Sequence, residues 1–255
     1  AAPPPADPPA TPPRTPTHPT DLDRLDQSKT VTSREYRKRR KKQQARHGEL
    51  GREAYRKGLS TVLVFEGPDA AGKGGAIRRT VHSLDARSYR VHQFAAPTDV
   101  ERAHPYLWRF WSRLPRAGNV AVFDRSWYGR VLVERLEGLA TEAEWRRAYN
   151  EINDFESQIV RRGMLLLKFW LHISKDEQLE RFEARANSPY KAWKLTDEDW
   201  RNRELWEDYE QAAHDMVQFT GTGDAPWVLI EGNDRQYARL KVLDTIIDGL
   251  EKQLD

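Results

Sequence analysis

The sequence predicts an α/β fold in which a five-stranded, mostly parallel sheet lies between two layers of helices. Five short apolar runs, rich in β-branched and aromatic residues, are typical of strands buried on both faces of a sheet. Amphipathic or charged segments with helix start and stop signals separate most of these runs. Strands that alternate with helices indicate βαβ units, and such units give a parallel sheet covered on both faces.

The expected elements follow one another in a regular order. A charged helix over Ser33–Lys57 ends at Gly58, and the last helix spans Arg235–Leu254. The strands are expected at Ser60–Gly67, Tyr89–Phe94, Asn119–Asp124, Met164–Ile173 and Pro226–Gly232. Between them we expect helices at Lys73–Leu84, at 99–115 with a kink at Pro105, and at Thr141–Gly163, the last starting with a capping-box pair of Thr141 and Glu144.

Composition divides the chain into a tail and a body. Nine of the 15 prolines fall within the first twenty residues, and that stretch holds almost no larger apolar side chain. Such a segment cannot bury enough surface to offset its ordering entropy. We therefore expect a disordered Pro-rich tail at 1–30, a basic helix at 31–58, and a single α/β domain at 59–255 with a lid near 183–200.

Charge and hydropathy limit the classes of protein to which the chain can belong. The net charge is only +3, so the chain as a whole does not resemble a nucleic-acid-binding protein. It has no apolar run long enough to span a membrane, no signal-peptide core and no cysteine. The scattered histidines show no zinc-ligand spacing. We expect a soluble cytoplasmic protein without membrane or nucleic-acid partners.

The stretch FEGPDAAGKGG (Phe65–Gly75) nearly fits the phosphate-binding pattern G-x-x-x-x-G-K-[ST]. Gly74 stands where the pattern has a hydroxyl residue that holds Mg²⁺, and Asp69 lies inside the loop. Inward-facing backbone amides and the start of the next helix favour a phosphate site. The alternative is a strand–helix turn whose glycines serve tight geometry alone. The expected phosphate-binding positions are Gly67, Ala70, Ala71, Gly72, Lys73, Gly74 and Gly75.

A second stretch, VFDRSWYGR (Val122–Arg130), also follows a predicted buried strand. A carboxylate at such a strand end, here Asp124, suits a Mg²⁺ ion, and Arg125 and Arg130 could neutralise phosphates. The alternative is an aspartate that caps a helix, with solvated arginines. Because ligands bind at the carboxyl ends of parallel strands, we expect this stretch to lie beside the glycine-rich loop.

A third stretch (Arg181–Trp200) places Arg181 and Arg185 on one helix face, followed by a break and by Lys191 and Lys194. A cationic segment here suits a lid that shields phosphoryl transfer from water, although a plain surface loop is the alternative. The aromatic run Tyr106–Trp111 is expected in the core or at a subunit interface, and the basic segment Arg34–Arg46 is either a solvated face or an attractant for a long polyanion.

With EGPDAAGKGG, FDRSWYGR and PYKAWKL in view, the chain resembles the polyphosphate kinase 2 family over about Thr61 to Leu250. The resemblance implies a P-loop kinase-like three-layer αβα sandwich with a helical lid, and it implies that the loop aspartate replaces the missing hydroxyl. It also implies Asp69 and Asp124 as ligands for Mg²⁺ (Mn²⁺ as an alternative), and Lys73, Arg125 and Arg185 as the clamp on polyphosphate and the transferring phosphoryl. Arg130, Lys191 and Lys194 match family positions near the phosphates or in the lid.

The implied reaction is reversible phosphoryl transfer from inorganic polyphosphate to a nucleotide. YLWRFW and PYKAWKLTDEDWRNRELWEDYE are most similar to the branch that converts AMP to ADP, many of whose members carry two fused domains, whereas this sequence holds one. Pro68 departs from the usual residues of the loop. The alternatives are a polyphosphate-dependent nucleoside diphosphate kinase (ADP to ATP, GDP to GTP), an ATP-dependent nucleotide kinase, and a polyanion-binding protein. The family resemblance also implies a homo-oligomer, either a dimer or a tetramer.

Overall fold

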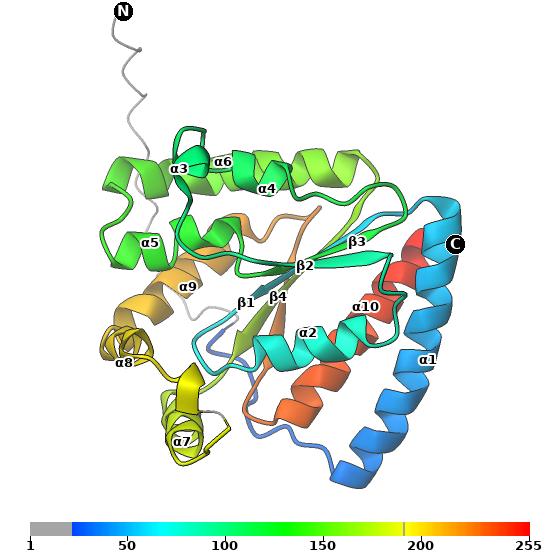
Figure 1. Ribbon diagram of the computed structural model, residues 1–255, viewed down its shortest axis with the longest axis horizontal. Coiled ribbons are helices and arrows are strands. Elements are labelled where there is room, and N and C mark those ends of the chain that lie inside the picture. Colours follow the sequence, from blue (N-terminus) through cyan, green and yellow to red (C-terminus); the bar gives the residue numbers. More distant parts are fainter. Residues whose placement is uncertain (1–21, 191) are drawn as a thin grey trace, which may run out of the picture.

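The computed structural model describes residues 22–190 and 192–255 and contains one five-stranded sheet (Figure 1). The strands are β1 (Thr61–Glu66), β2 (Tyr89–Gln93), β3 (Val120–Asp124), β4 (Leu165–His172) and β5 (Trp227–Glu231). They lie in the order β2-β3-β1-β4-β5, and every neighbouring pair is parallel. The predicted five-stranded parallel sheet is confirmed.

Helices cover both faces of this sheet (Figure 1). Helices α1 (Ser33–Lys57), α2 (Lys73–Val81) and α10 (Arg235–Leu254) lie over one face. Helices α6 (Glu142–Arg161) and α9 (Trp206–Thr220) lie over the other, together with the short helices α3 (Asp99–Arg102), α4 (Trp108–Trp111) and α5 (Val133–Leu136). Helices α7 (Lys175–Ala186) and α8 (Asp197–Glu204) stand at the carboxyl ends of the strands.

Alternation along the central strand divides the core into two halves. Leu63 and Phe65 of β1 pack with the layer of α1, α2 and α10, whereas Val62 and Val64 pack with the layer of α6 and α9. All six residues of β1 are buried, which explains why the strand reads as a continuous apolar run. The central strand is thereby fixed on both faces, and its carboxyl end has a defined position.

The predicted boundaries of the long elements agree closely with the structure. Helix α1 spans the predicted range, and it ends because Gly58 takes a left-handed φ of 75°. Helix α10 also begins and ends as predicted, and Thr141 and Glu144 form the predicted capping box of α6. The ends of each predicted strand lie within two residues of the ends of an observed strand.

Two expectations differ from the structure. Residues 99–115 form the two short helices α3 and α4 rather than one kinked helix, and Pro105, which has no N–H to donate, lies between them. The expected tail also ends earlier than residue 30, because Leu22 is buried in the core and Lys29 pairs with Glu231 at 3.0 Å. The rest of that tail, residues 1–21, lies outside the described residues.

Within residues 22–190 and 192–255, no helix combines the length and the apolar character needed to cross a bilayer.

Candidate active site

The glycine-rich loop joins β1 to α2 and has a strained backbone. Gly67 has a φ of 144°, and a Cβ placed there would lie 2.4 Å from the carbonyl oxygen of Leu171. Gly72 has a φ of 106°, and Ala70 is a non-glycine residue with a φ of 63°. Non-glycine residues rarely take positive φ, and those that do cluster at functional sites. The loop therefore has the tight backbone that the glycine pattern predicts.

The second predicted stretch begins at the end of β3, which is the direct neighbour of β1 in the sheet. Arg125 also has a φ of 63°, and its N–H donates to the carbonyl of Phe65 at 3.2 Å. Its guanidinium donates to Asp69 Oδ1 at 3.0 Å. The prediction that the two stretches lie side by side is confirmed.

Two opposite charges face each other inside the loop. Burial acts to raise the pKa of Asp69, but Lys73, Arg125 and the Asn202 amide outweigh it and hold the pKa below its ordinary value. Burial lowers the pKa of the Lys73 ammonium, and the carboxylates of Asp69 and Asp124 counteract part of that effect. Lys73 Nζ donates to the carbonyl of Gly67 at 2.5 Å. The ammonium is thus held over the loop, beside the place where phosphates would bind.

Arg181 of α7 fixes the loop from outside, a role that sequence spacing did not suggest. The side chain is 2% exposed, and Nη1 donates to the carbonyls of Ala70 at 2.8 Å and Ala71 at 3.0 Å. Nη2 donates to the carbonyls of Gly232 at 2.6 Å and Asn233 at 2.9 Å. The guanidinium therefore joins the loop to the end of β5.

The aromatic residues of FDRSWYGR are anchors in the core rather than site residues. Trp127 and Tyr128 are fully buried and donate to the same oxygen of Glu156, at 3.0 and 2.5 Å. Lys168 of β4 donates to the other oxygen of Glu156 at 2.7 Å and to Tyr128 at 2.9 Å. This buried network fixes the segment that carries Arg125.

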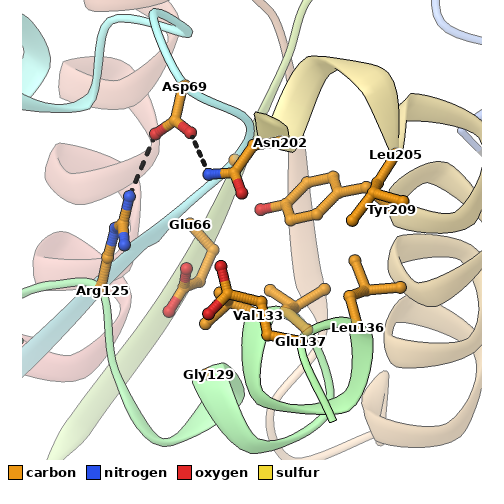
Figure 2. A pocket seen from close by; sticks show the side chains of 12 residues that line it. Glu66, Asp69, Arg125, Gly129, Val133, Leu136, Glu137, Asn202, Leu205 and Tyr209 are labelled. Carbon is orange, nitrogen blue, oxygen red and sulfur yellow. Dashed lines mark hydrogen bonds and ion pairs between the residues drawn. The ribbon is translucent and has the colours of Figure 1, made fainter. Parts of the chain in front are cut away.

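A small cavity, partly open to solvent, lies against the loop (Figure 2). One wall is polar and contains Glu66, Asp69, Arg125 and Asn202. The other wall is largely apolar and is formed by Leu132, Val133, Leu136, Leu205 and Tyr209. Asn202 of α8 donates to Asp69 Oδ2 at 2.8 Å, and Figure 2 draws this contact as a dashed line. The cavity therefore offers one charged side and one side that suits a flat apolar ring.

Sequence reasoning missed most of these lining residues, among them Glu66, Asn202 and Tyr209. Glu66 is buried and accepts from Ser126 Oγ at 2.8 Å, and burial raises the pKa of its carboxyl group. An acidic residue at the end of a strand whose four preceding residues are apolar was a signal that could have identified it. Asn202 and Tyr209 lie more than 130 residues from Asp69 in the sequence; both belong to the stretch PYKAWKLTDEDWRNRELWEDYE, but neither was singled out as a site residue.

The donor set suits a hard divalent cation. Asp69, Asp124 and Glu66 supply oxygen only, and carboxylate oxygens favour Mg²⁺ or Mn²⁺ over softer metals. Among the described residues no group of three or more His, Cys, Asp or Glu side chains is arranged so that it could hold a metal ion. Mg²⁺ usually binds one or two carboxylates and completes its shell with water and substrate phosphates, so the residues present fit such an ion.

The other predicted site residues lie outside the group formed by Asp69, Lys73 and Arg125. Gly74 and Gly75 begin α2 beside the loop. Arg130 pairs with Glu134 at 2.8 Å and stacks over Tyr106 with its guanidinium carbon 4.5 Å from the ring, so it lies with α5 rather than against Asp69. Arg185 is half-buried in the last turn of α7. The side chain of Lys194, like the whole of Lys191, lies outside what the structure describes.

A family model described as Polyphosphate kinase 2 (PPK2) matches residues 30–255. The chain belongs to the PPK2 family. It is 53% identical over 231 residues to the polyphosphate:AMP phosphotransferase of Pseudomonas syringae pv. tomato, covering 91% of this chain and 46% of that protein. The fold is therefore the P-loop kinase-like fold of PPK2 structures, as the motifs predict.

Two solved structures show how far the likeness extends. A crystal structure from Pseudomonas aeruginosa PA01 has a TM-score of 0.89 and 52% identity, and it covers 91% of this chain and 51% of that one. Polyphosphate kinase 2 from Arthrobacter aurescens TC1 has a TM-score of 0.86 and 36% identity, covering 89% of this chain and 84% of that one. The chain spans about half the length of the curated relatives from Pseudomonas that it matches.

Proposed function

We propose that this PPK2-family chain transfers the terminal phosphoryl group of inorganic polyphosphate to a nucleotide, with AMP as the acceptor and ADP as the product. One observation carries the proposal: Asp69, Lys73 and Arg125 converge beside a glycine-rich loop at the carboxyl ends of β1 and β3. The AMP acceptor is supported by the name of the Pseudomonas syringae relative.

The donor end of polyphosphate would lie over the loop. The amides of the loop and the first turn of α2 offer donors and a positive helix terminus to phosphate oxygens. The Lys73 ammonium, which the loop carbonyls of Gly67 and Pro68 hold at 2.5 and 3.2 Å, needs only a rotation to reach them. Such a site favours a linear polyanion because it supplies charge without enclosing a base.

The acceptor nucleotide would occupy the cavity beside Asp69. The apolar wall of Leu132, Val133 and Leu136 suits the nucleoside, and Arg125 reaches the boundary between the two substrates. Arg125 remains 42% exposed, so its guanidinium can exchange Asp69 for a phosphate oxygen. The two substrates would then meet between Lys73 and Arg125.

The chemistry requires alignment more than proton transfer. An α-phosphate oxygen of AMP forms a bond to the terminal phosphorus of the chain, while the bond from that phosphorus to its bridging oxygen breaks. The leaving oxygen stays on a polyphosphate that is one unit shorter. The attacking oxygen is already ionised at neutral pH, so no general base is needed. Lys73 and Arg125 hold the two anions in line and neutralise their repulsion.

Asp69 and Asp124 would hold Mg²⁺, or alternatively Mn²⁺, and the carboxyl group of Glu66 also lines this side of the cavity. The bound ion would offset phosphate charge and orient oxygens at the transfer point. The low pKa of Asp69 keeps its carboxylate ionised and ready for this role at neutral pH.

Residues outside the loop would complete the site when substrates bind. Arg185 at the end of α7, with Lys191 and Lys194 in the segment that follows, would close over the polyphosphate as a lid. Arg130 would act on the acceptor side only if its pair with Glu134 opens. Self-association through the exposed faces of Trp108 and Trp111 is part of the same proposal.

A donor–acceptor matrix tests the proposal. Purified protein with Mg²⁺ is given polyphosphate or ATP as donor, and AMP or ADP as acceptor, and the products are separated by chromatography. We expect ADP from polyphosphate and AMP. Phosphorylation of AMP by ATP but not by polyphosphate would refute polyphosphate as the donor. A clear preference for ADP over AMP would show that ADP is the acceptor.

A further inference from the structure

A basic groove lies at the edge of the sheet, apart from the glycine-rich loop. Strand β2 is an edge strand, and the segment 112–119, which connects α4 to β3, lies beside it. These segments enclose a groove of about 610 Å³ that is open to solvent. The groove reaches Val120 and Ala121 at the start of β3, whereas Asp124 ends that strand. Pockets for small ligands typically measure about 300–1,000 Å³, so this groove is large enough for a nucleotide.

The charged side chains that line this groove are all arginines. They are Arg87, Arg90, Arg113 and Arg116, and all four are exposed. Arg87 pairs with Asp85 at 3.1 Å. Within residues 22–190 and 192–255, the other three guanidinium groups form no ion pair with a carboxylate. We call this feature the arginine groove.

Two of these arginines lie close to one histidine of the groove. Burial, and then the charges of Arg113 and Arg90, lower the pKa of His92, so its ring is mostly neutral at pH 7. The charge of Arg113 also reaches Glu101, but Glu101 forms its ion pair with Arg109 at 3.6 Å. Like charges at short range repel one another, and a bound anion would relieve that repulsion.

Protection of the sheet edge explains only part of this pattern. Charged side chains on an edge strand prevent pairing with another chain, and Arg90 of β2 can serve that purpose. Arg113 and Arg116 belong instead to the segment before β3, which is not a strand. Edge protection also requires no groove. The convergence of a strand and a loop on one groove therefore indicates a site for an anionic ligand.

The other lining residues indicate a ligand that has a ring as well as negative charge. Leu114 and Pro115 lie in the groove with the arginines, and Tyr89 and His92 add flat rings. Guanidinium groups bind phosphate oxygens through a planar fork of donors. A linear polyanion would use the arginines alone, whereas a nucleotide would use both kinds of surface.

We propose that the arginine groove is a second nucleotide site, which binds the phosphates of a nucleoside diphosphate or triphosphate through Arg90, Arg113 and Arg116. The base of that nucleotide lies against Leu114 and Pro115. The inference goes beyond the proposed function, because binding at this groove needs neither polyphosphate nor turnover.

Nucleotide binding without turnover tests the site. Labelled ATP is titrated into the wild type and into Arg90→Gln/Arg113→Gln without polyphosphate, and the bound ATP is measured by equilibrium dialysis. We expect the variant to bind one ATP fewer per chain, because the loss of each charge-assisted contact weakens binding about tenfold or more. Both replaced side chains are exposed, so the melting temperature should stay unchanged. Equal numbers of bound ATP with equal affinities would overturn the site.

A matched control and a mapping experiment locate the bound nucleotide. Arg161→Gln/Arg162→Gln removes two exposed arginines at the end of α6 and should bind as much ATP as the wild type. In the wild type, photoactivated 8-azido-ATP should label peptides from residues 87–93 or 112–121. Labelling confined to peptides of the cavity beside Asp69 would overturn the site.

Tripolyphosphate tests whether the base contributes to binding. It carries phosphates without a nucleoside, so we expect it to displace azido-ATP from the groove peptides about tenfold less well than ATP does. Equal displacement would overturn the nucleotide assignment, because the arginines alone would then account for binding. If the wild type shows no polyphosphate-dependent turnover, the proposed function fails, whereas these binding experiments still decide the arginine groove.

Discussion

The guanidinium of Arg125 donates to the carboxylate of Asp69 at 3.0 Å, and this contact joins the end of β3 to the loop that follows β1. The pair is asymmetric, because the Asp69 side chain is 16% exposed and that of Arg125 is 42% exposed. Asn202 holds the second oxygen of Asp69 at 2.8 Å. Asp69 is therefore held from two sides, and Arg125 is the more exposed partner of the pair.

Replacing Arg125 with glutamine should reduce kcat by about 10²-fold or more, as the loss of a single preorganised group at a developing charge commonly does. The protein should still fold, because the replaced side chain is substantially exposed. Arg125→Lys keeps the charge but loses the planar fork, so we expect an intermediate rate. Turnover at the wild-type level in Arg125→Gln would show that Arg125 does not act on the phosphates.

The pH profile gives a second readout of the same contact. Arg125 helps to hold the pKa of Asp69 below its ordinary value, so Asp69 stays ionised throughout the neutral range in the wild type. Without Arg125 that pKa should rise, and the acid limb of kcat/KM, which reports ionisations of the free enzyme, should move to higher pH. The stability that Asp69 gains from its partners is present above its unfolded-state pKa and is lost as the pH falls through its folded-state pKa.

Two glycines of the loop should differ sharply in their tolerance of a side chain. Gly67→Ala would place a Cβ 2.4 Å from the Leu171 carbonyl oxygen at a φ of 144°, so we expect loss of activity and a lower melting temperature. Gly74 has no atom within 4 Å of the place where its Cβ would lie. Gly74→Ser, which restores the hydroxyl of the usual P-loop pattern, should fold normally.

Activity of Gly74→Ser tests how the loop handles its metal. If Asp69 has replaced the hydroxyl, the added serine should change kcat by no more than a few fold. Melting curves and initial rates of both glycine variants check these expectations. A large gain in Gly74→Ser would mean that the missing hydroxyl limits catalysis.

The sequence predicted the scaffold better than the cavity, and the reason is physical. Strands such as Thr61–Glu66 are buried on both faces, so their periodicity and composition are visible locally. Short motifs located Asp69, Lys73 and Arg125, because the loop and the strand end impose their spacing. Asn202 and Tyr209 come from α8 and α9, and only the packing of those helices brings them to the cavity.

For Arg181, the sequence pattern predicted the position of the side chain but not its role. It shares a helix face with Arg185, as the spacing predicted, but it is 2% exposed and donates to backbone carbonyls instead of facing a substrate. Spacing cannot distinguish an arginine that binds phosphate from one that satisfies buried carbonyls. Pro68 is buried within the loop, and nothing in the structure explains why it stands at that position.

Acid should destabilise the protein through His47. This residue is 2% exposed, and burial lowers its pKa from 6.5 to about 4. Below pH 6.5 the His47 side chain binds a proton in the unfolded state but stays neutral in the folded state. The free energy of unfolding should therefore fall by about 2 kcal/mol between pH 7 and pH 5. Urea unfolding of the wild type and His47→Gln at both pH values measures this contribution.

The exposed His82 provides the control for that experiment. His82→Gln should keep the pH dependence of the wild type, whereas His47→Gln should flatten it. An unchanged slope in His47→Gln would assign the acid sensitivity to other groups, such as His172, whose pKa burial also lowers to about 4.

Replacing Arg181 with methionine should damage both the fold and the loop. Four carbonyls, those of Ala70, Ala71, Gly232 and Asn233, would lose their donor. We expect the free energy of unfolding to fall by about 3 kcal/mol or more, because unsatisfied buried groups and a lost buried cation are both costly. Urea unfolding measures that loss, and Arg161→Met, at an exposed position of α6, is the matched control.

A positioning role for Arg181 predicts a kinetic effect beyond lost stability. Arg181→Lys keeps the positive charge, but one ammonium cannot reach two pairs of carbonyls as the guanidinium fork does. At a temperature where this variant is fully folded, we expect kcat to fall while KM for the acceptor changes little, since the cavity wall of Leu132 and Val133 is untouched. If the folded variant and the wild type have equal kcat, Arg181 stabilises the fold but does not position the loop for catalysis.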